Sequence, residues 1–140
     1  MQLTEHFHLG EFLQSQTASR LGIRNKPTEA IVENLKKLAE TLELVREYFE
    51  GKPLVISSGY RSPALNKAVG GARNSQHMQG LAVDFTIPGL SIDTIIAELR
   101  ETDLEFDQLI HEFNSWVHLS ISDNPRYQVL KIDKNGTKEI

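Results

Sequence analysis

One apolar stripe constrains the fold of this chain more than any other sequence feature. Between Pro27 and Gly51, apolar residues recur at alternating steps of four and three, at Ile31, Leu35, Leu38, Leu42, Val45 and Phe49. This spacing places them along one side of an α-helix, while the other side carries the Glu and Lys residues of a solvated surface. Such a helix needs an apolar surface to cover, and we expect the later strands to supply it.

Short segments rich in β-branched and apolar residues follow this helix. They predict strands over residues 54–58, 81–87, 106–113, 116–121 and 127–132, with a hairpin turn at Asn114-Ser115. Further helical turns are expected over residues 63–68 and from Ser91 or Asp93 to Leu99. Because helices and strands are segregated along the chain, we predict an α+β fold with a single antiparallel sheet and helices packed on one face.

Composition narrows the class of protein. The 140 residues fit one domain, residues 1–140, and the absence of cysteine excludes disulfides and thiolate metal sites. The net charge of −4 is spread without a basic run, so we expect no nucleic acid partner. No apolar segment approaches the roughly 20 residues of a membrane span. The first residues lack a signal-peptide pattern, so we expect the protein to be cytoplasmic as synthesised. We also expect it to be a monomer.

Strand alternation gathers polar side chains on one side of the predicted sheet. Asp84 and His118 each alternate with apolar neighbours, and Gln108 shares a strand face with Glu112. His77, in the loop before Asp84, can reach the same place. Two histidines and one aspartate are the mixed nitrogen and oxygen donors of a catalytic zinc site, in which a fourth position stays open for water.

Spacing alone leaves two interpretations of these residues. A metal ion would compensate polar groups that are costly to bury without partners. Alternatively, the polar side of the sheet binds a partner without performing chemistry. The remaining histidines, His6, His8 and His111, are expected to be structural or exposed, and His111 should face away from Glu112.

Four blocks of sequence, taken in order, carry a resemblance to a known family. They are Ser57-Ser58-Gly59-Tyr60-Arg61-Ser62, Asn66 with Gly70-Gly71-Ala72, Ser75-x-His77-x-x-Gly80-x-Ala82-x-Asp84, and Trp116-x-His118-x-Ser120. Together they resemble the zinc D-alanyl-D-alanine carboxypeptidases. This superfamily includes phage L-alanyl-D-glutamate endopeptidases and shares its fold with hedgehog signalling domains. The N-terminal part of the chain is similar to small members from phages and prophages.

The resemblance assigns roles to individual residues. It implies one zinc ion bound by His77, Asp84 and His118. Arg61 would bind a substrate carboxylate or polarise the scissile carbonyl, since a guanidinium can offer two parallel hydrogen bonds. Ser75 would help position the substrate or cap its loop, and Gln108 is expected to orient the peptide. Glycines near the site are expected to adopt positive φ, namely Gly70, Gly71 and Gly80.

One position departs from the family pattern. Better-known branches carry an acidic general base three residues before the last histidine, and here that position is Ser115, which has no useful proton affinity. Small phage-type relatives carry an acid in a block similar to Asp107-Gln108-Leu109-Ile110-x-Glu112. We therefore predict Glu112 as the base. The alternative is an exposed glutamate at a strand end, in an enzyme that is weakened or inactive.

The resemblance thus implies zinc-dependent hydrolysis of an amide bond in the peptidoglycan stem peptide. The protein would be a D-Ala-D-Ala carboxypeptidase or an endolysin-type endopeptidase that reaches the cell wall after release or phage delivery. Two non-catalytic alternatives stay open, a zinc-containing binding module and a structural or tail protein of a phage. The three retained ligands and Arg61 argue against both, whereas Ser115 keeps the binding module open.

Overall fold

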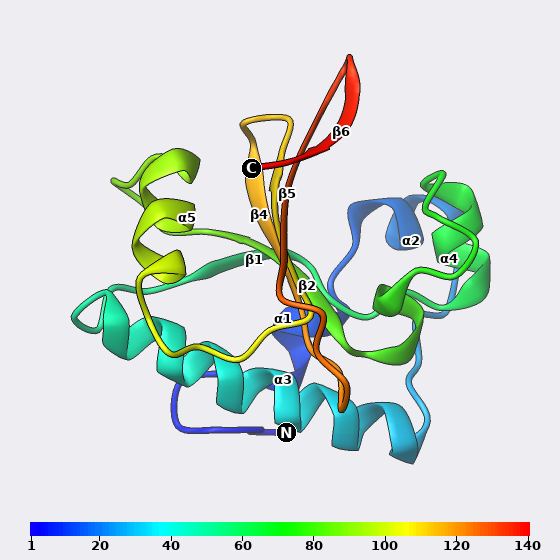
Figure 1. Ribbon diagram of the computed structural model, residues 1–140. Coiled ribbons are helices and arrows are strands. Elements are labelled where there is room, and N and C mark those ends of the chain that lie inside the picture. The colour runs from blue at the N-terminus through cyan, green and yellow to red at the C-terminus, as the bar shows by residue number, and fades with distance from the viewer.

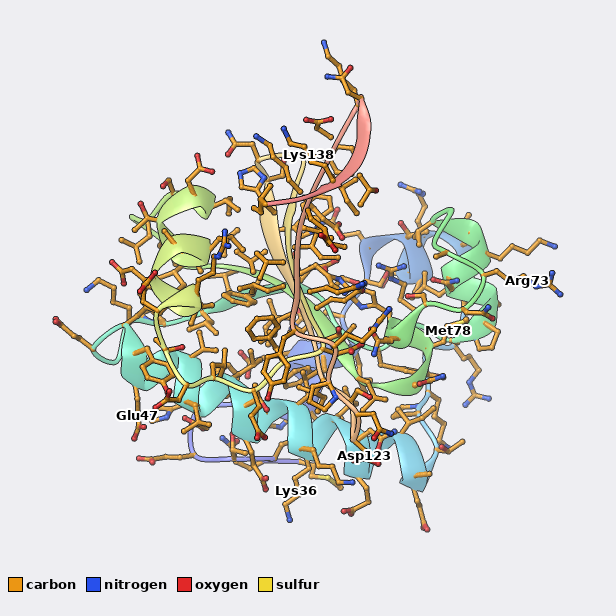
Figure 2. All side chains as sticks on the ribbon, viewed as in Figure 1. Lys36, Glu47, Arg73, Met78, Asp123 and Lys138 are labelled. Carbon is orange, nitrogen blue, oxygen red and sulfur yellow. The ribbon has the colours of Figure 1, made fainter.

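The long amphipathic helix forms where its stripe predicts it. The computed structural model describes residues 1–140, and α3 spans Glu29–Tyr48. Thr28 caps α3 by accepting a hydrogen bond from the backbone N–H of Ile31, and Glu29 lies in the first turn. The stripe from Leu35 to Phe49 is buried in the core. On the opposite side of the helix, Lys36 and Glu47 point away from the molecule (Figure 2).

Six strands form one sheet in the order β1-β2-β4-β3-β5-β6. Their bounds are β1 Val55–Ser58, β2 Ala82–Thr86, β3 Gln108–Glu112, β4 Trp116–Ser120, β5 Gln128–Asp133 and β6 Gly136–Glu139. All neighbouring strands are antiparallel except β3 and β5, which are parallel. The α+β class is confirmed, but the prediction of a purely antiparallel sheet is wrong. β4 already has β2 and β3 on its two sides, so the chain reverses after β4 and pairs with the free edge of β3.

Short helices complete the fold on both sides of the sheet. They are α1 Leu9–Leu13, α2 Gln16–Leu21, α4 Pro63–Ala68, the 3-10 turn η1 Gln76–Gln79 and α5 Ile92–Arg100. The helices predicted over residues 63–68 and 91–99 are confirmed, whereas α1, α2 and β6 were not predicted. In Figure 1, α5 lies to the left of the central strands and α2 and α4 lie to their right. The prediction that the helices pack on one face of the sheet is therefore confirmed for α3 and α5 and wrong for α2 and α4.

The two faces of the sheet differ in chemistry. A core cluster of 23 buried residues joins α1, α3 and α5 to the apolar sheet face, which carries Val83, Phe85, Val117 and Leu119. Neither α2 nor α4 contributes a residue to this cluster. The opposite face carries Asp84 and His118, which lie directly opposite each other on β2 and β4. None of the helices combines the length and apolar character that a membrane crossing requires.

Candidate metal centre

Two histidines and one aspartate converge where η1, β2 and β4 meet. His77, Asp84 and His118 are buried, and each offers a ligand atom within 4.8 Å of the other two. Asp84 Oδ1 lies 2.9 Å from His118 Nδ1 and 3.4 Å from His77 Nε2. A tetrahedral ion with bonds of about 2.0–2.2 Å holds its ligand atoms about 3.3–3.6 Å apart. The two distances from Asp84 Oδ1 are close to this range, so the three side chains fit one metal ion.

Local structure places each of these side chains. Asp84 and His118 meet because their strands pair in register. His77 lies in η1, which Ser75 caps by accepting a hydrogen bond from the His77 backbone N–H at 3.2 Å. Gly80 ends this turn with a φ of 72°, in the left-handed region that favours glycine. The structure thus gives Ser75 the capping position, and the positive φ expected at Gly80 is confirmed.

A backbone carbonyl fixes the ring of His77. Its Nδ1 lies 2.7 Å from the carbonyl oxygen of Gly59, so Nδ1–H donates there and Nε2 faces Asp84. Gly59 itself lies against α1, because a Cβ at this position would be 2.6 Å from the carbonyl oxygen of Phe12. Only glycine leaves room for this approach. Sequence reasoning missed this role of Gly59, since the contact joins segments 18 residues apart.

Oppositely charged side chains lie in contact with one another at the metal group. Burial raises the pKa of Asp84, but hydrogen bonds and positive charge from His118 and His77 outweigh burial and hold that pKa well below its usual range. Asp84 is therefore a carboxylate at neutral pH, as a metal ligand must be. Burial lowers the pKa of the Arg61 guanidinium, and the charges of Asp84 and Glu112 oppose that shift. Arg61 keeps its charge at neutral pH.

Arg61 is held at the edge of the metal group by side chains on both sides. Its Nη1 donates to Asn66 Oδ1 at 2.9 Å and its Nε to Ser58 Oγ at 3.3 Å, while Nη2 lies 3.8 Å from Asp84 Oδ2. A Cβ at Gly71 would collide with the side chains of Asn66 and Arg61. Gly71 is therefore needed for space. It is not among the residues with positive φ, so the prediction of positive φ is wrong for Gly71, whereas Gly70 has a φ of 72°.

Glu112 also lies beside the metal group. Its Oε1 is 3.8 Å from His118 Nδ1, and its Oε2 accepts a hydrogen bond from Trp116 Nε1 at 2.8 Å. The side chain is only 17 % exposed, so it is not a free glutamate at a strand end. Ser115 is exposed in the hairpin turn, where its hydroxyl donates to the carbonyl of Phe113. The structure thus places the acid on the strand face that alternation predicts.

The remaining predicted residues divide into two groups. Gln108 lines a cleft at the site and donates from Nε2 to Gln128 Oε1 at 2.9 Å. The other histidines lie elsewhere. His6 bonds Glu43, His8 caps α1, and His111 lies on the opposite face, 3.1 Å from Asp93.

Two clefts meet at the metal group. The α4 cleft, of about 800 Å³, runs past α2, β1 and α4 and reaches Asp84. The β5 cleft, of about 480 Å³, reaches His77 and His118 and continues along β3, β5 and β6. Arg61, Gly71 and Glu112 line both clefts. The side chains around the metal group are therefore accessible from two directions.

Two further polar residues organise the site, although periodicity assigns neither of them a role. Asn25 donates from Nδ2 to the carbonyls of Leu13 and Tyr60 and accepts from the backbone N–H of Ser62, which holds the loop of Arg61. Asp107 is 3 % exposed and accepts from Gln76, the neighbour of His77. Both residues act across long sequence separations, so periodicity could not reveal them.

Comparison with known proteins places this geometry in a family. Residues 5–120 match the model of the family described as Peptidase M15. Because the match covers most of the chain, the protein belongs to the Peptidase M15 family. A zinc D-Ala-D-Ala carboxypeptidase from Streptomyces albus G is similar, with 44 % identity over 44 residues. That match covers 31 % of this chain and 17 % of the relative, so it spans only a small part of the relative's length.

Proposed function

We propose that this protein is a zinc metallopeptidase that hydrolyses an amide bond in the peptidoglycan stem peptide. The reaction would be that of a D-Ala-D-Ala carboxypeptidase or of an endolysin-type endopeptidase. The observation that carries the proposal is the meeting of His77, Asp84 and His118 with Glu112 at the junction of two clefts. Membership of a peptidase family and the similarity to a zinc carboxypeptidase support it.

The donor set accounts for the choice of metal. Two imidazoles and one carboxylate are typical ligands of catalytic zinc, and the absence of cysteine leaves no softer donor in the chain. When bound, a zinc ion would lower the pKa of its water to about 7 and polarise the substrate carbonyl. His77 is pre-oriented for this ion because Gly59 occupies its other ring nitrogen.

Glu112 is proposed as the general base. Trp116 holds one of its carboxylate oxygens, and the other faces His118, so the carboxylate can accept a proton from a water at the centre. It would then pass that proton to the leaving amine, a contribution of about 10²–10⁴-fold in rate. Arg61 would bind a substrate carboxylate or the scissile carbonyl, because its guanidinium lines both clefts and is held in place by Asn66.

Access to the cell wall forms part of the same proposal. We propose that the protein acts after release from the cell or delivery by a phage particle. The basis is the resemblance of its four sequence blocks to small phage-type peptidases.

Metal analysis combined with digestion of purified peptidoglycan tests the proposal. We expect one zinc ion per chain and soluble fragments whose masses identify the cleaved bond. Glu112→Gln should retain zinc and lose about 10²–10⁴-fold in rate, whereas Ser115→Ala, with its exposed hydroxyl, should cleave like the unmodified protein. Bound zinc without any cleavage would instead identify a non-catalytic binding module.

A further inference from the structure

The β5 cleft contains an arginine that the proposed reaction does not use. Arg126 lines this cleft together with His77 and His118, and its side chain is 52 % exposed. It lies just before β5, and no residue of α4 lines this cleft. Its position raises the question of which substrate group it would contact.

A buried carboxylate holds this arginine in one orientation. Arg126 donates from Nε to Asp107 Oδ1 at 3.0 Å and from Nη2 to Asp107 Oδ2 at 2.7 Å. The backbone N–H of Arg126 also donates to Oδ1, at 2.9 Å. A guanidinium carries five N–H donors, and Asp107 occupies two of them. Because Asp107 lies behind the arginine and does not line the cleft, the other donors are left for the solvent side.

The charges of the two clefts differ. Among the residues that line the β5 cleft, Arg61 and Arg126 are cationic and Glu112 is the one carboxylate. The α4 cleft is lined by Arg61 and by two carboxylates, Asp84 and Glu112. Asp107 offsets the charge of Arg126, so a substrate carboxylate is favoured in the β5 cleft by the donors that Arg126 keeps free and by the absence of a second lining carboxylate. The fixed planar guanidinium suits such a group, because it can donate two parallel hydrogen bonds without first being ordered.

The shared walls of the clefts define the path of the substrate. Since Arg61 and Glu112 line both clefts, a peptide that reaches the metal group from the α4 cleft can continue into the β5 cleft. We propose that Arg126 is a specificity-determining residue, which binds a carboxylate-bearing residue of the substrate in the β5 cleft. This inference rests on the proposed peptidase function.

Peptides that differ only in one side chain test the subsite. Each pair has the same sequence and carries either a carboxylate or a carboxamide at one position, scanned on both sides of the cleaved bond. We expect the unmodified protein to prefer the acid at one position by about 10- to 100-fold in kcat/KM, the range of a hydrogen bond to a charged group. The readout is this acid-to-amide ratio, which a purely structural role of Arg126 would not change.

The variants remove the charge without leaving a buried carboxylate unpaired. In Asp107→Asn/Arg126→Gln both partners become neutral, and the ratio should fall to near one. Arg73→Gln makes the same charge change at an exposed arginine that lines neither cleft and points outward (Figure 2), so the ratio should stay as in the unmodified protein. An unchanged ratio in the double variant, or equal loss of cleavage for acid and amide peptides, overturns the subsite.

Failure of the peptidase proposal is recognised separately. If the unmodified protein cleaves neither peptide of a pair, the proposed function fails. Binding of the same peptides to zinc-loaded Glu112→Gln protein, measured by titration calorimetry, then decides on the subsite. Tighter binding of the acid peptide that is lost in the triple variant with Asp107→Asn and Arg126→Gln supports it, and equal binding of acid and amide overturns it.

Discussion

Two histidine–aspartate pairs lie on opposite faces of the same sheet, and only one belongs to a metal group. His118 Nδ1 is 2.9 Å from Asp84, and His111 Nε2 is 3.1 Å from Asp93. Both histidines are buried, but the side chain of Asp84 is 6 % exposed whereas that of Asp93 is 81 % exposed. The first pair gains a third donor from His77, while the ring nitrogens of His111 form no hydrogen bond of good geometry.

The comparison shows what a metal site requires beyond a short contact. A histidine and a carboxylate side by side are common, and on the His111 face they make at most a partly solvated ion pair. On the His118 face, a third ligand, a buried carboxylate and a carbonyl behind His77 fix the geometry before any ion binds. Burial of the histidine alone does not distinguish the two pairs.

Removal of each histidine should give the largest contrast. His118→Ala takes away a ligand, so we expect metal affinity to fall by more than about 100-fold, beyond the loss caused by changes behind the ligands. His111→Ala should keep the metal and lose only stability. Competition with a chromophoric chelator measures both affinities. Similar losses in the two variants would contradict the distinction between the pairs.

The carbonyl behind His77 offers the next test. In Gly59→Ala the new Cβ meets the backbone of Phe12, so α1 and the Gly59 carbonyl must separate. We expect a loss of about 10–100-fold in metal affinity and about 1–3 kcal/mol in the free energy of unfolding. Gly89→Ala is the control, because its φ of 90° gives strain but its Cβ meets nothing. Metal affinity that falls equally in both variants would rule out a specific role for Gly59.

A second buried carboxylate, Asp107, is paired with an arginine instead of histidines. Hydrogen bonds from Arg126 hold the pKa of Asp107 below its usual range. Its contribution to stability is therefore fully present above the unfolded carboxyl pKa of about 4 and is lost as pH falls through the lower folded pKa. We expect Asp107→Asn to lower the free energy of unfolding by about 1–3 kcal/mol at pH 7. Denaturant titrations should show this difference shrinking below pH 4; a difference that grows there would have the wrong sign.

Asn66 holds Arg61 beside the metal group, and the His111 face has no such pair. Asn66→Ala removes the acceptor of Arg61 Nη1 and leaves all three metal ligands in place. We expect zinc content to be unchanged and kcat/KM to fall about 10-fold, as expected for one hydrogen bond to a charged group. Kinetics on a stem peptide with parallel metal analysis measures both. Loss of zinc together with activity would show that Asn66 supports the metal group instead.

Neutralising the exposed partner of His111 should have the smallest effect. Asp93 is largely solvated, so Asp93→Asn is expected to change the free energy of unfolding by about 0.2–1 kcal/mol. Metal affinity should not change. Thermal unfolding with and without zinc measures both quantities, and a change in metal affinity would reveal coupling between the two faces of the sheet.

Periodicity predicted the parts of the fold whose side chains are divided between core and solvent. α3 and the strands carrying Asp84 and His118 have such patterns, and the structure has these elements. β6 is exposed along its whole length, so it has no apolar alternation to detect. The helices α1 and α2 are too short for a period and are defined by the caps His8 and Ser15. The parallel pairing of β5 depends on which sheet edge is free, and alternation within one strand does not encode that.

The residues of the candidate site also divide into those that the sequence indicates and those that only the tertiary structure shows. Strand alternation put Asp84, His118 and Glu112 on one face, and the structure brings them together. The contacts of Gly59 and Asn25 join parts of the chain 18 and 35 residues apart, so only the tertiary structure shows them. A sequence can thus indicate the groups that touch an ion or a substrate more readily than those that hold them in place.

The direct pairing of β2 with β4 has a consequence for the lifetime of the protein. Asp84 and His118 lie 34 residues apart in sequence, so an ion held by both, and by His77, would act as a reversible cross-link between distant segments. Free zinc at about 1,000 times its Kd would add about 4 kcal/mol to the stability of the folded chain. Resistance to proteolysis would then rise with the zinc concentration of the surroundings, which makes the half-life of this chain a readout of available metal.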